Sequence, residues 1–347
     1  MNESQKTRRI LDAALDGHAP SKDDCIWLLD IPSTSLDAAL LMATADAVSR
    51  RRFGNHAILL GQIGIDIAPC PGNCGFCVFG KDHAKMEPAQ MPLDEVRRRA
   101  HSFADNGDLF ALFLMTMHEF DLNRLLQTVS AVRKKIPAHT QIVVNIGDFD
   151  LNQAMQLKAA GVNGAYHVCR LREGRDTSLD PQSRLNTFRV IKETGLDFYY
   201  CCEPVGPEHT SVELVEQMFL GIEHGCFQHA AMRRVYTPGV PLGRNGQITD
   251  RRLAQVTAVV ALASLACTET KNIAVHEPNL LGLVAGANVV YAETGANPRD
   301  VETDTEKHRG LDMAACRTML YEAGFDALLR GDGAILRLGL DYIMGFQ

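Results

Sequence analysis

The sequence predicts an α/β protein, a (β/α)8 TIM-type barrel that follows an N-terminal helical extension. Two observations carry this prediction. From residue 55 onward, short apolar runs rich in β-branched and aromatic residues alternate with amphipathic stretches of helical period. Eight such runs occur, and eight parallel strands separated by helices can close into a barrel. A doubly wound open sheet is the competing arrangement.

The expected strands follow one another at regular intervals along the chain. They comprise residues 57–65, 109–115, 140–146, 164–169, 197–204, 229–235, 272–276 and 287–293. Several of the helical stretches between them end in glycine, the usual C-terminal stop of a helix. Residues 1–54 show a helical pattern, with Ser21 as a candidate cap. We therefore divide the chain into a helical extension, residues 1–54, and a barrel, residues 55–347.

Charge and hydropathy exclude several classes of protein. The formal net charge is −7, and no basic block occurs, so sequence-independent nucleic-acid binding is not expected. No apolar stretch is long enough to span a membrane. The polar N-terminus lacks the apolar core of a secretion signal, which predicts a cytoplasmic protein.

Three of the ten cysteines, Cys70, Cys74 and Cys77, fall within eight residues directly after the first expected strand. In a reducing compartment, clustered cysteines indicate ligands or catalysts. Their C-x3-C-x2-C spacing allows three thiolates to bind three irons of a cubane iron–sulfur cluster, which leaves the fourth iron open. The loop follows a strand, where barrel enzymes place their active sites. A structural zinc site is the alternative, with His83 as its fourth ligand.

With Phe76 directly before the last cysteine, this motif resembles that of the radical S-adenosylmethionine enzymes. The resemblance implies a [4Fe–4S] cluster whose open iron binds the amino and carboxylate groups of S-adenosylmethionine. One electron then splits S-adenosylmethionine into methionine and a 5′-deoxyadenosyl radical, which abstracts hydrogen from a substrate. The resemblance also implies an electron donor such as flavodoxin or ferredoxin.

Three further segments narrow the resemblance to the biotin synthase-like branch of this superfamily, which includes methylornithine synthase. They are residues 234–242, 272–288 and 292–300. The resemblance places contacts to S-adenosylmethionine at the ends of strands: Met115, Thr116 and Met117 after the second, Arg170 and Glu173 after the fourth, and Val205 and Gly206 after the fifth.

Polar residues at the strand ends also predict the kind of substrate. Arg170, Glu173, His276 and Glu277 are the candidate catalytic residues on this rim. Such an interior suits a small molecule that carries amino or carboxylate groups, because arginine binds carboxylates in a bidentate fashion. The sequence thus predicts a small polar substrate.

The absence of one ligand set separates this chain from biotin synthase itself. Biotin synthase holds a second, sulfur-donating cluster through three cysteines and an arginine, and those positions fall near Phe113, Val144, Tyr200 and Ile273. Hydrogen abstraction followed by rearrangement, cleavage or fragmentation, in the synthesis of a cofactor or an amino-acid-like product, is therefore favoured. Two alternatives stay open. One is sulfur insertion that uses other cysteines, such as Cys169, Cys201 and Cys202. The other is a non-catalytic iron–sulfur or zinc protein.

Overall fold

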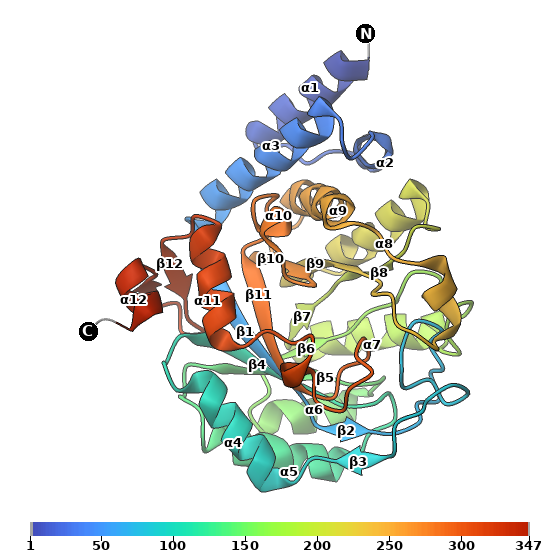
Figure 1. Cartoon of the computed structure of the whole chain (residues 1–347), viewed down its shortest axis with the longest axis vertical. Helices are drawn as coiled ribbons and strands as arrows, with labels where there is room; N and C mark the ends of the chain where they lie inside the picture. The colour runs from blue at the N-terminus through green and yellow to red at the C-terminus, as the bar shows by residue number, and fades with distance from the viewer. Residues whose placement is uncertain (1–2, 346–347) are drawn as a thin grey trace.

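The computed structural model describes residues 3–345, and eight of its parallel strands close into a barrel (Figure 1). The order is β1 (His56–Gly64), β4 (Leu109–Met115), β5 (Gln141–Asn145), β6 (Gly164–Tyr166), β7 (Asp197–Tyr199), β9 (Gln228–Arg233), β10 (Asn272–His276) and β11 (Val289–Gly295). The barrel closes where β11 pairs in parallel with β1, Ile58 lying opposite Val289. This closure confirms the predicted barrel, and the open sheet is wrong.

Helices cover the outside of the barrel between successive strands. They are α4 (Leu93–Ala104), α5 (Leu122–Arg133), α6 (Leu151–Ala159), α7 (Pro181–Thr194), α8 (Ser211–Glu223), α9 (Asp250–Ala263), α10 (Leu280–Leu283) and α11 (Met313–Glu322). The structure also has three short 3-10 helices, η1 (Pro241–Asn245), η2 (Ser264–Ala266) and η3 (Thr305–Lys307). Side-chain caps fix where many helices begin. Asp150, for example, accepts the N–H of Gln153 at 2.8 Å at the start of α6.

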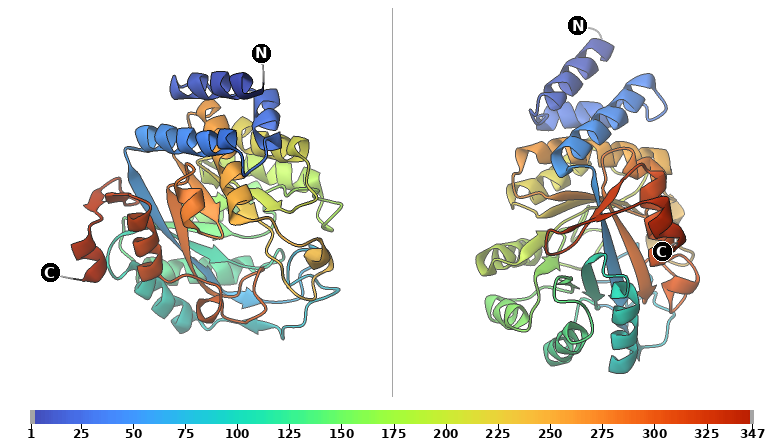
Figure 2. Two further views of the ribbon diagram at one scale, coloured as in Figure 1. Left: turned by 45° about the horizontal axis from the view of Figure 1, so that its top comes forward. Right: turned by 90° about the vertical axis from the view of Figure 1, so that its left-hand side faces the viewer.

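Three helices precede the barrel: α1 (Glu3–Leu15), α2 (Lys22–Asp30) and α3 (Leu36–Phe53). Ser21 caps α2 in a reciprocal capping box with Asp24, as the sequence predicts. The two views of Figure 2 show these helices together on one side of the molecule, where α3 packs on α9 and α2 packs on α8. None of the helices among residues 3–345 is long and apolar enough to cross a membrane.

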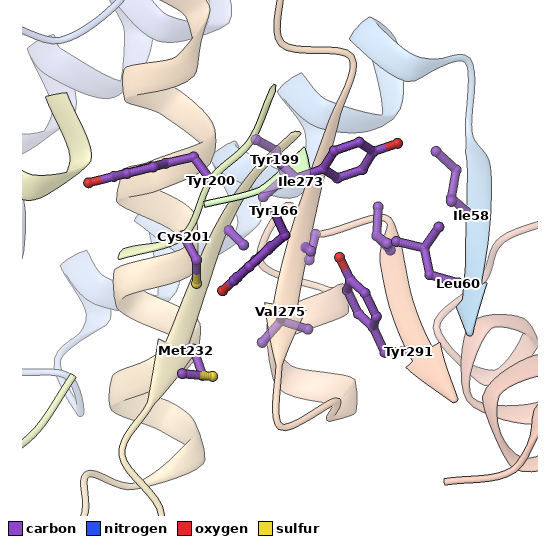
Figure 3. Packing of buried hydrophobic residues seen from close by; sticks show 14 of the residues in the cluster. Ile58, Leu60, Tyr166, Tyr199, Tyr200, Cys201, Met232, Ile273, Val275 and Tyr291 are labelled. Carbon is purple, nitrogen blue, oxygen red and sulfur yellow. The ribbon is translucent and has the colours of Figure 1, made fainter. Parts of the chain in front are cut away.

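The fifth expected strand is interrupted. Its two halves, β7 and β8 (Cys202–Val205), are separated by Tyr200 and Cys201. The Tyr200 hydroxyl donates to the carbonyl of Gln217 on α8 at 3.0 Å, whereas Cys201 lies on the inner side, beside Tyr166 (Figure 3). Neighbouring residues of a strand point to opposite faces, and the Cys202 sulfur accordingly faces away from Cys201 and lies 3.8 Å from the Leu214 carbonyl on α8.

Several small elements complete the fold. Near the C-terminus, β12 (Ala327–Leu329) and β13 (Ile335–Arg337) form a hairpin before α12 (Leu340–Met344). In this hairpin, β12 pairs in parallel with the first residues of β1. After β1, the two-residue strands β2 (Asp66–Ile67) and β3 (Ala89–Gln90) pair with each other and enclose the cysteine-bearing segment between them. All barrel strands are parallel, so their carboxyl ends gather around this segment.

Candidate active site

The three thiols of the cysteine motif lie on one closed loop after β1. The N–H of Cys70 donates to the carbonyl of Phe79 at 2.7 Å, and the N–H of Lys81 donates to the carbonyl of Cys70 at 3.0 Å. These bonds join the two ends of the loop. Gly75 allows a neighbouring segment to approach closely, because a Cβ there would lie 3.1 Å from the Leu242 side chain. The loop therefore has a defined shape before any ligand binds.

All three thiols border a single cavity. Burial raises the pKa of Cys74 to about 11, and burial together with the nearby Cys74 and Cys70 sulfurs raises the pKa of Cys77. These sulfurs therefore lie close enough to repel one another when ionised, and a cationic centre between them would relieve that repulsion. The donor set fits a [4Fe–4S] cluster held through three of its irons.

His83 does not complete a four-ligand zinc site. Its Nε2 lies 2.7 Å from the carbonyl oxygen of Cys77, and its ring packs against Gly80, where a Cβ would lie 2.2 Å away. The imidazole is therefore engaged with the loop backbone. Because structural zinc takes four protein ligands, the three thiols alone fit that alternative poorly.

The cavity extends from the cysteine loop into the barrel and brings together many of the predicted residues. Among them, the cavity lining includes Cys70, Cys74, Cys77, Phe76, Met115, Thr116, Met117, Arg170 and His276. Four others lie outside the lining: Glu173, Glu277, Val205 and Gly206. The direct contacts expected of these four residues with cofactor or substrate are therefore not supported by their position.

Arg170 is joined to two other residues that line the cavity. Its Nε lies 3.2 Å from Oε1 of Glu203, and the hydroxyl of Tyr166 donates to Oε2 of the same carboxylate. Burial alone would lower the pKa of Arg170, but the carboxylates of Glu203 and Glu173 raise it. The Glu203 side chain is only 3% exposed. This buried ion pair holds the guanidinium in a fixed place on the cavity wall.

Glu173 stabilises the backbone at Arg170. Its carboxylate accepts the N–H of Arg170 at 2.8 Å and the hydroxyl of Thr177 at 2.7 Å. The side chain is 1% exposed. Glu173 therefore orients the backbone at Arg170 and does not face the cavity.

The guanidinium of Arg234, the residue that directly follows β9, packs against the turn after β8. A Cβ on Gly206 would lie 2.6 Å from the guanidinium of Arg234, which also binds Glu208 at 2.8 Å. Val205 is buried, and its carbonyl accepts the N–H of Arg234 at 2.8 Å. Arg234 itself lines the cavity, so it takes the place predicted for the two turn residues.

A chain of polar side chains crosses the inner part of the cavity. Nε2 of Gln62 on β1 donates to Glu293 on β11 at 3.0 Å, and its Oε1 accepts from Asn145 on β5 at 3.3 Å. Nη2 of Arg299 donates to Glu293 at 3.0 Å. We call this set, together with His276, the polar floor: Gln62, Asn145, His276, Glu293 and Arg299. The signal in the sequence was a glutamine inside an otherwise apolar strand, and sequence reasoning did not use it.

His276 and Glu277 lie at the end of β10 but face different neighbours. His276 is 7% exposed, lines the cavity and packs 4.5 Å from the ring of Tyr291. Glu277 has a φ of 65° and pairs instead with Arg299, at 2.7 Å, and with Arg309. The left-handed backbone at Glu277 thus turns its carboxylate toward the loop after β11.

His276 should make stability depend on pH. Burial, and to a smaller extent the positive charge of Arg299, lower the pKa of His276 to about 3. The unfolded chain binds a proton at this residue below its ordinary pKa of about 6.5, whereas the folded protein does not. Stability from this residue is therefore full above about pH 6.5 and is lost as the pH falls.

Between pH 7 and 5, wild type should lose about 2 kcal/mol more unfolding free energy than His276→Gln. Urea titrations of both proteins at the two pH values measure this. If both proteins lose the same unfolding free energy, His276 binds its proton at pH 5 in the folded protein as well as in the unfolded chain.

No family model matches the sequence, but individual proteins do. Biotin synthase of Carboxydothermus hydrogenoformans is 23% identical over 326 residues, which cover 88% of this chain and 97% of the relative. Biotin synthase of Saccharopolyspora erythraea is 21% identical and covers 75% of this chain and 74% of its own length. The similarity to known proteins therefore extends over most of the barrel.

Solved structures agree on the fold. Methylornithine synthase (PylB) superposes with a TM-score of 0.77 at 17% identity, over 93% of this chain and 98% of that protein. HydG of Carboxydothermus hydrogenoformans, a maturase of the FeFe-hydrogenase, gives a TM-score of 0.74 at 17% identity, over 93% of this chain and 79% of its own. The chain is thus similar over almost its whole length to biotin synthase and forms a closed barrel whose cavity is lined by three thiols, which supports a radical S-adenosylmethionine enzyme that resembles biotin synthase.

Proposed function

We propose that the protein removes a hydrogen atom from a small polar substrate held on the polar floor, and that rearrangement, cleavage or fragmentation of the substrate follows. A [4Fe–4S] cluster and S-adenosylmethionine are the cofactors, and when bound they supply the 5′-deoxyadenosyl radical. One observation carries the proposal: the cysteine loop and the polar floor open into the same cavity. The substrate class points to the synthesis of a cofactor or of an amino-acid-like product.

The chain's own residues take separate parts in this proposal. Cys70, Cys74 and Cys77 would hold the cluster. Phe76 and residues 115–117 border the cavity near the loop and would contact S-adenosylmethionine. Arg170, fixed by Glu203, would bind a carboxylate or a ribose hydroxyl through a charge-assisted hydrogen bond. An external one-electron carrier such as flavodoxin or ferredoxin would reduce the cluster.

Packing inside the barrel argues against sulfur insertion. Phe113 is fully buried and its ring lies 5.2 Å from the rings of both Tyr199 and Tyr291, so aromatic side chains fill the level at which biotin synthase has a second cluster. Of the candidate thiols nearby, Cys201 faces the interior and Cys202 faces α8 (Figure 3). This arrangement of Cys201 and Cys202 disfavours a second cluster that uses both thiols.

The protein is therefore expected not to convert dethiobiotin to biotin. Phe113, Val144, Tyr200 and Ile273 stand where the ligands of a sulfur-donating cluster are expected, and aromatic rings pack around Phe113, so we expect no such cluster beside the substrate. Anaerobic incubation with dithionite, S-adenosylmethionine and dethiobiotin, followed by mass spectrometry, tests this expectation. An authentic biotin synthase run in parallel shows that the assay works, and biotin formed by this protein would overturn the distinction.

The origin of the abstracted hydrogen tests the proposed function itself. Small-molecule fractions from cells grown in deuterated medium are supplied to the anaerobically reconstituted protein in unlabelled water. The proposal predicts that one fraction transfers deuterium into 5′-deoxyadenosine, and that fraction contains the substrate. Unlabelled 5′-deoxyadenosine with every small-molecule fraction would contradict a small polar substrate.

A further inference from the structure

We infer that the substrate is a neutral or zwitterionic molecule, without a phosphate group, that presents one oxygen atom to Arg299 and His276. This inference rests on the proposed function, because it assigns the ligand of the polar floor. Two independent features of the cavity lead to it: the pairing of its charges and the unused hydrogen-bonding capacity of these two residues.

Each arginine that lines the cavity already has a carboxylate partner. The pairs are Arg170 with Glu203 at 3.2 Å, Arg184 with Asp148 at 2.8 Å, Arg234 with Glu208 at 2.8 Å, Arg299 with Glu293 at 3.0 Å, and Arg233 with Asp250. Of these carboxylates, Glu203 and Glu293 are 3% and 10% exposed and line the cavity themselves, whereas Asp250 is 46% exposed. The lining is therefore rich in charge, but the positive charge is compensated.

A substrate that brings extra negative charge into this cavity would lack a counter-charge. Moving an unpaired anion from water into a buried site is costly, and freeing an arginine for it would leave the carboxylate of that arginine unpaired instead. A phosphate ester carries close to two negative charges at neutral pH and is the least favourable ligand. A zwitterion or an uncharged polar molecule adds no net charge.

Two polar atoms of the polar floor can still form a strong hydrogen bond to a ligand. Nε2 of His276 is buried and has no hydrogen-bond partner among residues 3–345. Within the described part of the chain, Nη1 of Arg299 has a single acceptor, the sulfur of Met232 at 3.0 Å, and a thioether is a weak acceptor. A substrate oxygen would satisfy both groups, with His276 carrying its proton on Nε2.

The rest of the floor holds these two groups in position. Glu293 accepts a hydrogen bond from Nη2 of Arg299, and the carboxylate of Glu277 lies 2.7 Å from Nε of Arg299. Two carboxylates therefore fix the position of this guanidinium. Gln62 fixes Glu293 in turn. The ring of His276 packs between Tyr166 and Tyr291, at centroid distances of 6.0 and 4.5 Å. The site is preorganised, so little is lost in ordering it around a ligand.

Matched probes that differ only in a phosphate group test the charge argument. The reconstituted protein with S-adenosylmethionine is titrated with L-serine and O-phospho-L-serine, with glycerol and glycerol 3-phosphate, and with acetamide and the common L-amino acids. We expect at least one neutral or zwitterionic probe to bind. Its phosphorylated partner, where the set contains one, should bind at least about tenfold more weakly. A phosphate ester that binds as tightly as its partner, or no binding by any neutral or zwitterionic probe, would overturn the inference.

Histidine labelled with ¹⁵N locates the bound probe. The bound probe should shift the Nε2 signal of His276, assigned by its absence in His276→Phe. That variant keeps an aromatic ring between Tyr166 and Tyr291 and should bind the probe about tenfold more weakly. Met218→Leu is the control, because Met218 is a fully buried residue of α8 outside the cavity lining, and this variant should bind within about threefold of wild type. A bound probe that leaves the His276 signal unmoved would refute the assigned contact.

The two proposals can fail separately. If 5′-deoxyadenosine forms but phosphate esters bind best, only the substrate class is wrong. If no 5′-deoxyadenosine forms under reducing conditions, the proposed function fails, whereas the binding preference can still be measured.

Discussion

Cys74→Ala is expected to abolish the reductive cleavage of S-adenosylmethionine. The Cys74 thiol lines the cavity on a loop that is closed at both ends by backbone hydrogen bonds, so a neighbouring thiol cannot shift into its place. Each thiolate of the set would hold a different iron, and a missing ligand leaves the cluster labile. Iron, sulfide and 5′-deoxyadenosine should all fall to background after anaerobic reconstitution.

A buried cysteine elsewhere provides the matched control. Cys25 on α2 is fully buried in the helical extension. Cys25→Ala removes a thiol of similar burial and should retain iron, sulfide and cleavage activity, with only a modest loss of stability. A Cys74→Ala protein that keeps about four irons per chain and normal cleavage would disprove the ligand assignment.

Arg170→Ala is expected to cost both stability and binding. It leaves the buried carboxylate of Glu203 without its cationic partner. Removal of one member of a buried ion pair typically destabilises a protein by about 3–5 kcal/mol. The same change removes the fixed guanidinium from the cavity wall, so the affinity for S-adenosylmethionine or substrate should fall at least about tenfold.

A second substitution separates these two effects. Arg170→Ala with Glu203→Gln removes the orphaned charge, so it should recover much of the stability while binding stays weak. Arg172→Ala serves as the neighbouring control, because Arg172 pairs with the partly exposed Glu213 at 2.6 Å and should cost about 1 kcal/mol or less. Urea unfolding and equilibrium dialysis with S-adenosylmethionine give the two quantities. If the stable double variant binds S-adenosylmethionine with full affinity, Arg170 is not part of the binding site.

The strands were predictable because each is a short buried run of a parallel sheet. The limits of β10 agree with the expected residues 272–276, and β4 agrees with residues 109–115. The break between β7 and β8 was not visible, since residues 198–202 are all aromatic residues or cysteines and only tertiary packing sends Tyr200 outward and Cys201 inward. The hairpin of β12 and β13 was missed, although Gly331-Asp332-Gly333 is a recognisable turn signal.

The site was predictable where the chemistry is local and not where distant segments meet. The cysteine loop is a continuous motif, so its residues could be named from the sequence. Arg299 and Gln62 come together only because β11 closes on β1, and a linear pattern does not show that meeting. Glu173 and Glu277 stand at the expected places in the chain, but hydrogen bonds to Arg170 and Thr177 engage the carboxylate of Glu173, and a left-handed backbone turns that of Glu277 away.

The central claim is that the cysteine loop supports radical chemistry on S-adenosylmethionine. The most direct measurement quantifies 5′-deoxyadenosine after anaerobically reconstituted protein is mixed with dithionite and S-adenosylmethionine, beside a variant in which Cys70, Cys74 and Cys77 are all alanine. We expect the wild-type protein to form 5′-deoxyadenosine and the triple variant to form none. Equal amounts from both proteins, or none from a wild-type protein that holds its full complement of iron and sulfide, would contradict the claim.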